Sequence, residues 1–227
     1  MKKDYVEVVY NNIDRPLTNY PNKLTKYLFD KYELKKEDKL LEIGCGRGEF
    51  LQGFVNLGIK GFGVDRSDNA KKICKNSEIK ITDLEKEKIP YSDEYFDIVY
   101  SKSLIEHFYY PEKIFEEIFR VLKPGGKVIT LTPDWKNTVK VFYEDYTHRT
   151  PFTMNSLNDI HLINGFDDVK IEKFRQLPIL WEKNIYNKIL LTLSYLTNTF
   201  LVPNNFRKYK WVKFSKEIML LSFAKKK

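Results

Sequence analysis

Short runs of β-branched and aromatic residues alternate with amphipathic helical patterns along most of the chain. Buried-strand patterns occur at residues 39–43, 60–64, 79–82, 95–101, 127–132, 169–174 and 218–223. Helical patterns fill the intervals at residues 21–34, 49–57, 67–75, 111–122 and 155–164. This regular alternation of strand and helix predicts an α/β fold with a doubly wound, mainly parallel sheet.

The interval between the sixth and seventh predicted strands breaks the alternation. It holds a leucine-rich helical stretch at 185–200, a turn at Pro203 and the basic, aromatic run FRKYKWVKFSK at 206–216. Connections between elements are usually about 2–6 residues long, so an insertion of this size predicts a lid or a partner surface. Its longest apolar stretch, 189–202, falls short of the ~20 residues that a membrane-spanning helix needs.

The excess of positive over negative charge lies in the C-terminal part of the chain. The formal net charge is +8, but residues 175–227 hold 11 basic and two acidic residues, whereas residues 1–174 hold 28 basic and 29 acidic ones. A basic chain invites a nucleic-acid interpretation, yet most of this one is electrically balanced. We therefore expect no nucleic-acid partner.

The two cysteines and the N-terminus both favour a cytoplasmic protein. Cys45 lies inside a glycine-rich segment where a crosslink to Cys74 would be obstructive, so a disulfide framework of the secreted type is not predicted. The first residues are polar after two lysines and contain no apolar export segment.

A glycine-rich loop follows the first predicted strand, in the string LLEIGCGRGEF at 40–50. Gly44, Gly46 and Gly48 at a strand-to-helix turn permit positive φ and let a nucleotide cofactor approach the backbone. A dinucleotide fingerprint would have its third glycine where Glu49 stands, which disfavours NAD. Glu42, just before the loop, suits a cationic ligand such as the amino group and sulfonium of S-adenosylmethionine.

Acidic residues end the next two strands. Asp65 lies about 20 residues after the loop, where a carboxylate can accept both ribose hydroxyls. Asp83 follows the third strand and can accept the exocyclic amine of adenine, with Leu84 beside the ring. Each acid could instead be a solvated strand end or a helix cap, but the loop and both acids in this order favour a nucleotide site.

These motifs resemble those of the class I S-adenosylmethionine-dependent methyltransferases. The resemblance covers residues 36–175 and rests on LLEIGCGRGEF, GVD, TDLE, FDIVYSKSLIEHF, FRVLKPGGKVIT and LTPDW. It implies a Rossmann-like sheet of seven strands with the last antiparallel, S-adenosylmethionine as cofactor and S-adenosylhomocysteine as product. The predicted cofactor-binding residues are Glu42, Gly44, Cys45, Gly46, Gly48, Asp65, Arg66, Asp83, Leu84, Ser101 and Lys102, the last two at the reactive end.

The chain then divides into four segments. Residues 1–35 form an N-terminal cap or substrate segment, 36–175 the cofactor-binding methyltransferase core, 176–216 a helical and basic-aromatic insertion, and 217–227 the final strand with a basic tail.

Methyl transfer is an in-line displacement with a neutral leaving group, so proximity and alignment are the main tasks. An alcohol acceptor gains from a base, whereas a phosphate-type oxygen needs only positioning. Of the three histidines, His148 is the leading base candidate, with Asp145 to orient its ring, and His107 is the second. His161, inside a predicted helix, is interpreted as structural.

The segment around His148 allows two other interpretations. Asp145 and Thr153 could simply cap a helix start. A metal site built from Asp134, Asp145 and His148 is conceivable, but the spacing matches no ligand signature, so we predict no metal.

The stretch 145–153 also resembles the D-x-x-H-x-x-P-F-T segment of small-molecule methyltransferases from surface and capsular polysaccharide clusters. That resemblance implies O-methylation of a small, anionic acceptor, either a sugar hydroxyl or a phosphate or phosphoramidate group. The predicted substrate-binding residues are Arg15, Tyr20, Tyr146 and Arg149.

Two other methyltransferase classes compete with this hypothesis. The leucines of 185–201 beside the basic run could lie on an anionic membrane, giving a lipid or quinone acceptor and peripheral contact with the inner membrane face through 185–214. They could equally pack against the sheet. An RNA methyltransferase is the weaker rival, and the tetrad with which DNA amino-methyltransferases hold a flipped base is replaced by SKSL at 101–104. A cofactor-binding scaffold without activity would need a broken cofactor site, and the oligomeric state has no sequence signature.

Overall fold

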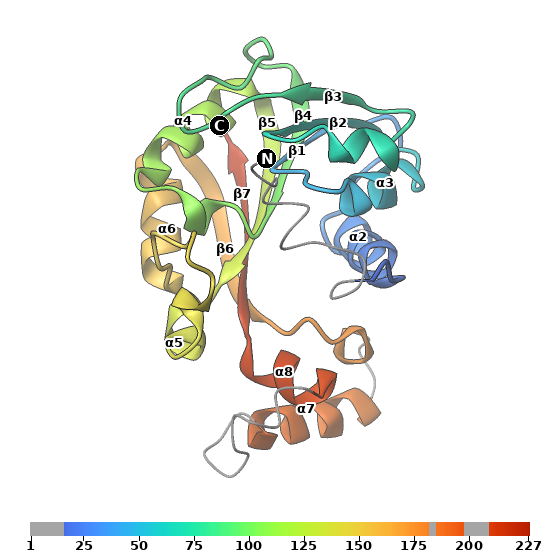
Figure 1. The fold of residues 1–227 in the computed structure, drawn as a ribbon, viewed down its shortest axis with the longest axis vertical. Coiled ribbons are helices and arrows are strands. Elements are labelled where there is room, and N and C mark those ends of the chain that lie inside the picture. The colour runs from blue at the N-terminus through green and yellow to red at the C-terminus, as the bar shows by residue number, and fades with distance from the viewer. Residues whose placement is uncertain (1–15, 182–184, 198–208) are drawn as a thin grey trace, which may run out of the picture.

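The computed structural model describes residues 16–181, 185–197 and 209–227, which form a seven-stranded sheet with helices on both faces (Figure 1). The strands are β1 (Lys39–Ile43), β2 (Lys60–Asp65), β3 (Glu78–Ile81), β4 (Phe96–Lys102), β5 (Leu122–Pro133), β6 (Phe166–Phe174) and β7 (Met219–Lys226). Their order is β3-β2-β1-β4-β5-β7-β6. β7 pairs antiparallel with both β5 and β6, and the other pairs are parallel. The predicted seven-stranded sheet with an antiparallel last strand is therefore confirmed.

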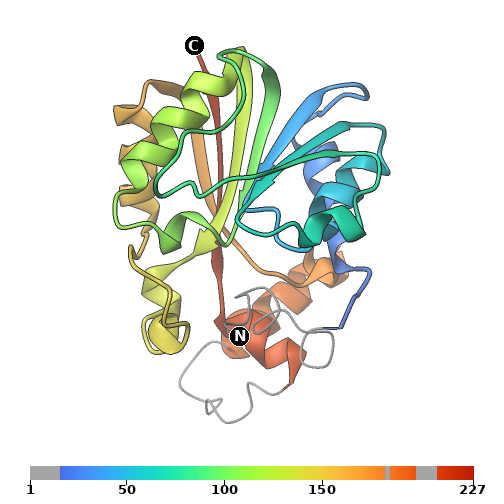
Figure 2. The ribbon, with the colours of Figure 1, turned by 45° about the horizontal axis from the view of Figure 1, so that its top comes forward.

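Helices cover the two faces of the sheet in separate layers (Figures 1 and 2). The main helices are α2 (Tyr20–Lys31), α3 (Glu49–Val55), α4 (Pro111–Val121) and α6 (Met154–Ile163), with a short α5 (Trp135–Thr138). One core cluster joins α4 and α6 to Leu41 and Val99, and the other joins α2 and α3 to Leu40 and Ile98. Successive strand residues point to opposite faces, so each buried strand contributes to both clusters.

One predicted helix is replaced by a turn. Residues 67–75 were expected to be helical, but the structure has only a 3₁₀ turn at Asn69–Lys72. Asp65 Oδ1 accepts the Ser67 N–H at 2.9 Å, and Ser67 Oγ accepts the Asn69 N–H at 3.2 Å. These local side-chain bonds compete with the helical hydrogen bonds and explain the difference.

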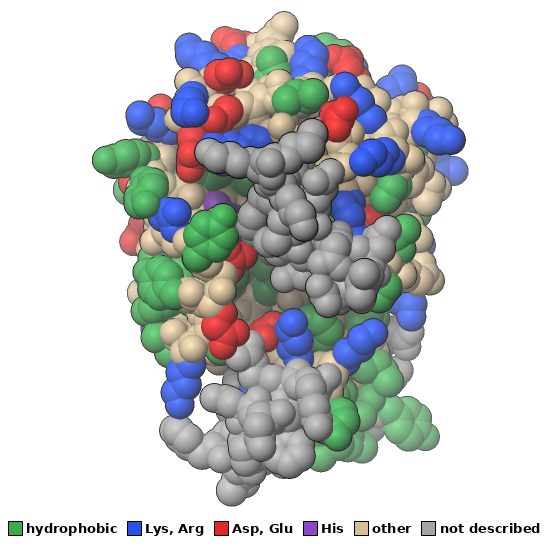
Figure 3. Space-filling model, in the orientation of Figure 1, with side chains coloured by type: hydrophobic (Ala, Val, Ile, Leu, Met, Phe, Trp, Pro, Cys, Tyr) green, Lys and Arg blue, Asp and Glu red, His purple; other side chains and the backbone are tan. Residues whose placement is uncertain are grey.

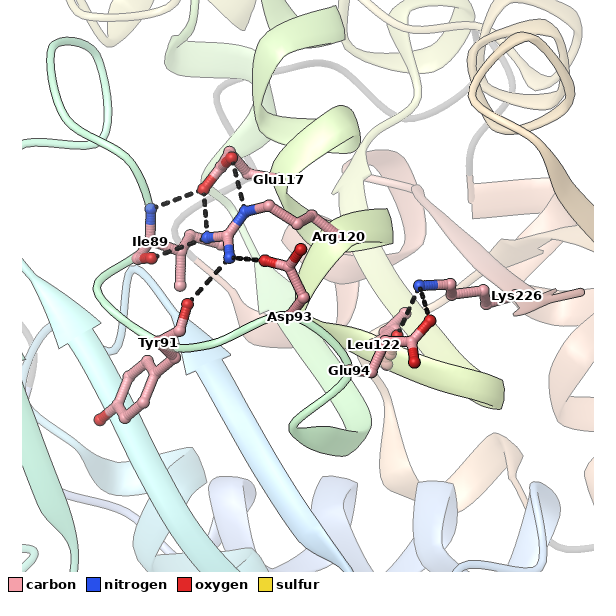
Figure 4. A network of polar contacts seen from close by, with 8 residues as sticks. All are labelled: Ile89, Tyr91, Asp93, Glu94, Glu117, Arg120, Leu122 and Lys226. Carbon is pink, nitrogen blue, oxygen red and sulfur yellow. Dashed lines mark hydrogen bonds and ion pairs between the residues drawn. The ribbon is translucent and has the colours of Figure 1, made fainter.

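The edge of the sheet at which β4 begins is tied together by Arg120, near the end of α4 (Figure 4). Its guanidinium donates to the carbonyl of Ile89 at 2.8 Å, to the carbonyl of Tyr91 at 2.9 Å and to Glu117 at 2.7 Å. It also pairs with Asp93 at 2.7 Å. The network fixes the loop before β4 at the edge opposite to the glycine loop.

The predicted insertion contains α7 (Ile185–Thr197) and α8 (Lys210–Lys216), between β6 and β7. The two helices contact each other through buried hydroxyls, with Ser194 Oγ 2.9 Å from Ser215 Oγ. Phe174 pairs with Met219, which pairs with Pro133 at the carboxyl end of β5. The insertion therefore leaves the sheet at the edge where β1, β4 and β5 end. The turn at Pro203 lies outside the described residues.

One face of α7 carries exposed apolar side chains. Tyr186, Ile189, Leu193 and Leu196 follow one another at helical spacing and are 47% to 74% exposed. Hydrophobic side chains gather over this helix in the space-filling view, whereas positive and negative side chains are mixed over the upper part of the same face (Figure 3). Among the described residues, no helix has the length and apolar character needed to span a membrane.

Candidate functional site

The glycine loop follows β1 and lies at the side of the sheet formed by the carboxyl ends of the parallel strands. Gly44, Gly46 and Gly48 have φ of +70°, +50° and +83°, a region that favours glycine. A Cβ at Gly44 would lie 2.7 Å from a methyl group of Leu104, and one at Gly48 would lie 2.7 Å from the sulfur of Cys74. A Cβ at Gly46 would meet no atom within 4 Å. Packing against the Ala70 backbone therefore restricts Gly48, and at Gly44 the Leu104 side chain would have to shift, whereas Gly46 faces open space in which a ligand can approach the backbone.

Asp65, at the end of β2, holds this loop in place. Its Oδ2 accepts the Gly46 N–H at 2.8 Å. A carboxylate offers about four acceptor sites on its two oxygens and can accept several donors at once, ribose hydroxyls among them. The structure places Asp65 directly beside the open position at Gly46, and its ribose-binding role stays a prediction.

Glu42, in β1, is a buried carboxyl group with an unsatisfied oxygen. Its Oε2 has no hydrogen-bond partner among the described residues. Burial raises the pKa of Glu42 well above its usual range, with a further upward contribution from Asp65. A buried acceptor without a partner is costly, and a cationic amino group would satisfy it. The orphan oxygen of Glu42 and the open space at Gly46 fit S-adenosylmethionine.

Asp83, two residues after β3, is ion-paired on the surface. Arg66 Nη2 lies 2.9 Å and Lys86 Nζ 3.2 Å from the carboxylate. Hydrogen bonding to Arg66 lowers the pKa of Asp83 to about 2. The structure therefore brings together Arg66, Asp83 and the half-buried Leu84, and their contact with adenine stays a prediction.

A second group of titratable residues lies at the same edge, beyond β4. Glu106 is fully buried, and its Oε2 accepts the Thr132 hydroxyl at 3.0 Å while Oε1 has no partner among the described residues. Burial raises the pKa of Glu106 to about 7. The rings of His107 and His148 stand edge to face with centroids 4.8 Å apart. Burial, together with the neighbouring His148, lowers the pKa of His107 to about 4.

The partners of the two imidazoles fix their tautomers. His148 Nδ1 lies 2.6 Å from the carbonyl oxygen of Phe142, which can only accept, so Nδ1 carries the proton. The Thr147 hydroxyl donates to Asp145 at 2.5 Å, and His107 Nδ1 lies 2.9 Å from the same hydroxyl oxygen. Thr147 therefore accepts from His107. In the neutral form of each ring, the lone pair is therefore on Nε2.

Asp145 was predicted to orient the His148 ring, and this role stays a prediction. The Phe142 carbonyl lies against Nδ1 of that ring, and Asp145 accepts the Thr147 hydroxyl, which also contacts His107. The alternative helix-cap interpretation holds for Thr153, which accepts the Ser156 N–H at the start of α6. It does not hold for Asp145, which precedes a turn.

Backbone bonds bring the two histidines together from distant parts of the chain. The carbonyl of Glu106 accepts the N–H of Arg149 at 2.8 Å and of Thr150 at 3.0 Å. These bonds dock the segment that carries His148 onto the turn that follows β4.

The predicted substrate-binding residues are not gathered at one place, as the two histidines are. Arg149 donates to the backbone carbonyls of Tyr146 and His148 and lies over the Tyr109 ring, and Tyr146 is exposed. Tyr20 donates to Gln176 Oε1 at 3.2 Å, linking α2 to the segment after β6. Arg15 lies outside the described residues.

Three further predicted residues have defined positions. Ser101 is buried in β4, and Lys102 Nζ lies 5.4 Å from the centre of the Phe50 ring. Cys45 is buried with a free thiol whose pKa is raised by burial. His161 is buried in α6 and shares a 3.0 Å hydrogen bond with Ser222, as its structural interpretation predicted.

Sequence reasoning missed Glu106, Thr147 and the Phe142 carbonyl as parts of the histidine site. The acid could have been found, because an acidic residue next to a histidine just after a buried strand is a signal. A backbone carbonyl has no sequence signal.

Comparison with known proteins identifies the core. Residues 41–130 match the family described as a methyltransferase domain. An uncharacterised protein of Methanocaldococcus jannaschii is 37% identical over 112 residues, which are 49% of this chain and 53% of that protein. The chain spans about half or less of the length of the curated relatives it matches first.

Solved structures share the fold. An S-adenosylmethionine-dependent methyltransferase from Archaeoglobus fulgidus aligns with a TM-score of 0.65 at 24% identity, covering 98% of this chain and 100% of the other. Haemonchus contortus phosphoethanolamine N-methyltransferase 2, solved with phosphomonomethylethanolamine and S-adenosylhomocysteine, aligns with a TM-score of 0.64 at 20% identity, covering 90% and 52%. Residues 41–130 are thus similar to methyltransferase domains, and the sheet order and the glycine loop agree with the fold of the solved S-adenosylmethionine-dependent methyltransferase.

Proposed function

We propose that this chain transfers a methyl group from S-adenosylmethionine to an oxygen of a small polar acceptor. The observation that carries the proposal is the pair of histidines at the edge of the sheet that holds the glycine loop, with the lone pair of each ring on Nε2. Such a group suits an acceptor hydroxyl, whose proton must leave as the oxygen attacks. A sugar hydroxyl or a phosphate or phosphoramidate group of a surface polysaccharide precursor is the acceptor class we favour.

The cofactor supplies an electrophilic methyl group on a sulfonium. In our proposal Glu42 receives its amino group, the Gly46 backbone lies against it, and Asp65 accepts the ribose hydroxyls. Asp83 and Leu84 frame adenine, and Ser101 and Lys102 stand at the reactive end of the site.

His148 activates the acceptor in this proposal. The acceptor oxygen forms a bond to the methyl carbon, the carbon–sulfur bond breaks toward sulfur, and the hydroxyl proton passes to His148 Nε2. The Phe142 carbonyl fixes the ring orientation that this transfer needs. Asp145, through Thr147, fixes His107 beside it.

A phosphate-bearing acceptor is supported by the charges at this edge. Arg149 lies on the segment that carries His148, with its guanidinium on backbone carbonyls from which it can turn to an anionic group. Tyr146 is exposed beside it, and Tyr20 and Arg15 belong to the N-terminal segment. The solved relative with phosphomonomethylethanolamine shows that this fold accommodates a small phosphate ester.

The test is an S-adenosylhomocysteine release assay across nucleotide-linked sugars, phosphoramidates, phosphoethanolamine and quinones. Turnover on an oxygen acceptor that falls at least about 100-fold in His148→Ala supports the proposal, since general base catalysis contributes about 10²–10⁴-fold. His161→Gln, in a histidine outside the site, is the matched control. An unchanged rate and pH profile in His148→Ala would remove the assignment.

A second candidate, an acceptor carried by a membrane lipid or quinone, is favoured by the apolar face of α7. The neighbouring α8 carries three lysines, and an apolar face together with nearby basic residues suits an anionic membrane surface. The pair Ile189→Asn and Leu193→Asn should reduce flotation with anionic liposomes, against Lys188→Gln as control for charge alone. Equal flotation of the asparagine pair and the wild type would exclude this surface.

The two free cysteines agree with our proposal of a cytoplasmic location.

A further inference from the structure

Three ligand-type atoms from two distant segments converge beside β4. A ring nitrogen of His107, a ring nitrogen of His148 and a carboxylate oxygen of Glu106 all lie within 4.8 Å of one another. Two imidazoles and one carboxylate form the protein ligand set of many catalytic zinc and non-haem iron centres. The grouping differs from the Asp134, Asp145 and His148 set considered from sequence, because Asp134 is buried as the cap of α5.

The hydrogen bonds behind the two rings match those of metal-binding histidines. A ligating imidazole almost always donates its other N–H to a carbonyl or a carboxylate, which fixes the ring and its tautomer. His148 donates from Nδ1 to the Phe142 carbonyl at 2.6 Å. His107 donates from Nδ1 to Thr147, which passes the bond on to Asp145. In both rings the nitrogen that can bind a cation is therefore Nε2.

Glu106 supplies a second, independent observation. Its side chain is fully buried, Oε2 is held by Thr132, and Oε1 lacks a hydrogen-bond partner among the described residues. Leaving a buried carboxylate oxygen without a hydrogen-bond partner is energetically costly. A cation bound between the carboxylate and the two imidazoles would satisfy it.

We infer that Glu106, His107 and His148 form a binding site for one divalent transition-metal ion of the Zn²⁺, Fe²⁺ or Co²⁺ class. Three protein ligands leave a coordination position for an exogenous oxygen, as in catalytic metal sites. The role of the ion rests on the proposed function. The ion would bind and polarise the acceptor oxygen, and the proton of the acceptor hydroxyl would pass to water. In the metal-loaded protein His148 then acts as a ligand, in place of the free base of the metal-free protein.

The first experiment uses the unmodified chain. Chelator-treated protein is titrated with Zn²⁺ while long-range ¹H–¹⁵N spectra follow the three histidine rings. The signals of His107 and His148 should change together and saturate at one equivalent. His161, hydrogen-bonded to Ser222 elsewhere, is the internal control and should not move. Unchanged signals of His107 and His148 at millimolar Zn²⁺ would overturn the inference.

The second experiment uses Co²⁺ as the probe and its visible absorption as the readout. We expect one Co²⁺ per chain, with affinity at least about tenfold weaker in His148→Ala and Glu106→Gln, and about 10–100-fold weaker in the supporting variant Asp145→Asn. Asp159→Asn, an exposed acid on α6, is the control. Equal Co²⁺ affinity in wild type and His148→Ala would overturn the site, as would a thiolate charge-transfer band, which would place the ion at Cys45 or Cys74.

Binding of S-adenosylhomocysteine, measured by calorimetry on the same variants, separates the two proposals. If the protein binds Co²⁺ at the histidines but transfers no methyl group to any oxygen acceptor, the metal site is supported and the proposed function is refuted. If the chelated protein methylates an oxygen acceptor at full rate and its histidine signals do not change in Zn²⁺, the proposed function is supported and the metal site is refuted.

Discussion

Replacing Gly46 by alanine separates ligand approach from packing in the loop after β1. All three loop glycines have positive φ, so alanine is strained at each of them. At Gly46 the added Cβ enters open space, whereas at Gly48 it would lie 2.7 Å from Cys74 Sγ and 3.1 Å from the carbonyl oxygen of Ala70. Gly48→Ala is therefore the matched variant in which packing fails as well.

The two variants should differ in stability by an amount that follows from these contacts. A left-handed conformation costs a non-glycine residue about 1–2 kcal/mol, and this is the whole expected loss of unfolding free energy for Gly46→Ala. Gly48→Ala adds overpacking of about 1–3 kcal/mol, for a total of about 2–5 kcal/mol. Urea unfolding monitored by circular dichroism measures both.

Cofactor affinity should respond in the opposite order to stability. If the cofactor lies against the Gly46 backbone, the new methyl group occupies its place, and the Kd for S-adenosylhomocysteine rises at least about tenfold, or about 1.4 kcal/mol. Calorimetry at a temperature where both variants are folded gives this value. Wild-type affinity in Gly46→Ala would refute our interpretation of the loop, whatever the stability result.

Three further predictions concern charge and pH. Arg120→Met should lower the free energy of unfolding by about 3 kcal/mol in urea without changing the Kd for S-adenosylhomocysteine, because the partly buried Glu117 carboxylate loses its ion-pair partner and two carbonyls lose their donor. Asp93→Asn, whose carboxylate is 72% exposed, should cost less than about 1 kcal/mol, and equal losses would contradict the network. Burial lowers the pKa of His161 to about 3, so on acidification the unfolded chain binds a proton at this histidine before the folded chain does. The neutral buried ring therefore contributes its full stabilisation above pH 6.5, and this contribution falls by about 1.4 kcal/mol per pH unit toward pH 3. The pH dependence of the unfolding free energy of His161→Gln should lack this part of the slope, and the same pH dependence in variant and wild type would reject the prediction. Arg66→Ala should raise the pKa of Asp83 from about 2 toward 3.8, as followed by the carboxyl ¹³C shift, and a constant pKa would show that Arg66 is not its cause.

The fold could be predicted because the strands that build it are strongly patterned. Residues 39–43 were predicted to be a strand and form β1 without change, and the antiparallel β7 followed from the family resemblance. The helix expected at 67–75 failed because Asp65 and Ser67 accept nearby backbone N–H groups, an interaction that periodicity does not contain.

The candidate site was predictable only where it is local in sequence. The glycine loop and Asp65 lie in consecutive elements, so their order alone indicated a nucleotide site. The meeting of His107 with His148 depends on backbone bonds from Arg149 and Thr150 to Glu106, which join segments about 40 residues apart. The sequence pattern suggested both histidines separately and could not show that they share one site.

The position of β7 has a consequence for the order in which the protein can be completed during synthesis. β7 lies between β5 and β6 in the sheet but follows both in the chain, and β6 has β7 as its neighbour at the edge. Until residues 219–226 have left the ribosome, β5 keeps an open edge and β6 has no strand to join. A nascent chain that already contains the glycine loop and both site histidines therefore still exposes an unfinished sheet, and the insertion carrying α7 and α8 is tethered at only one end.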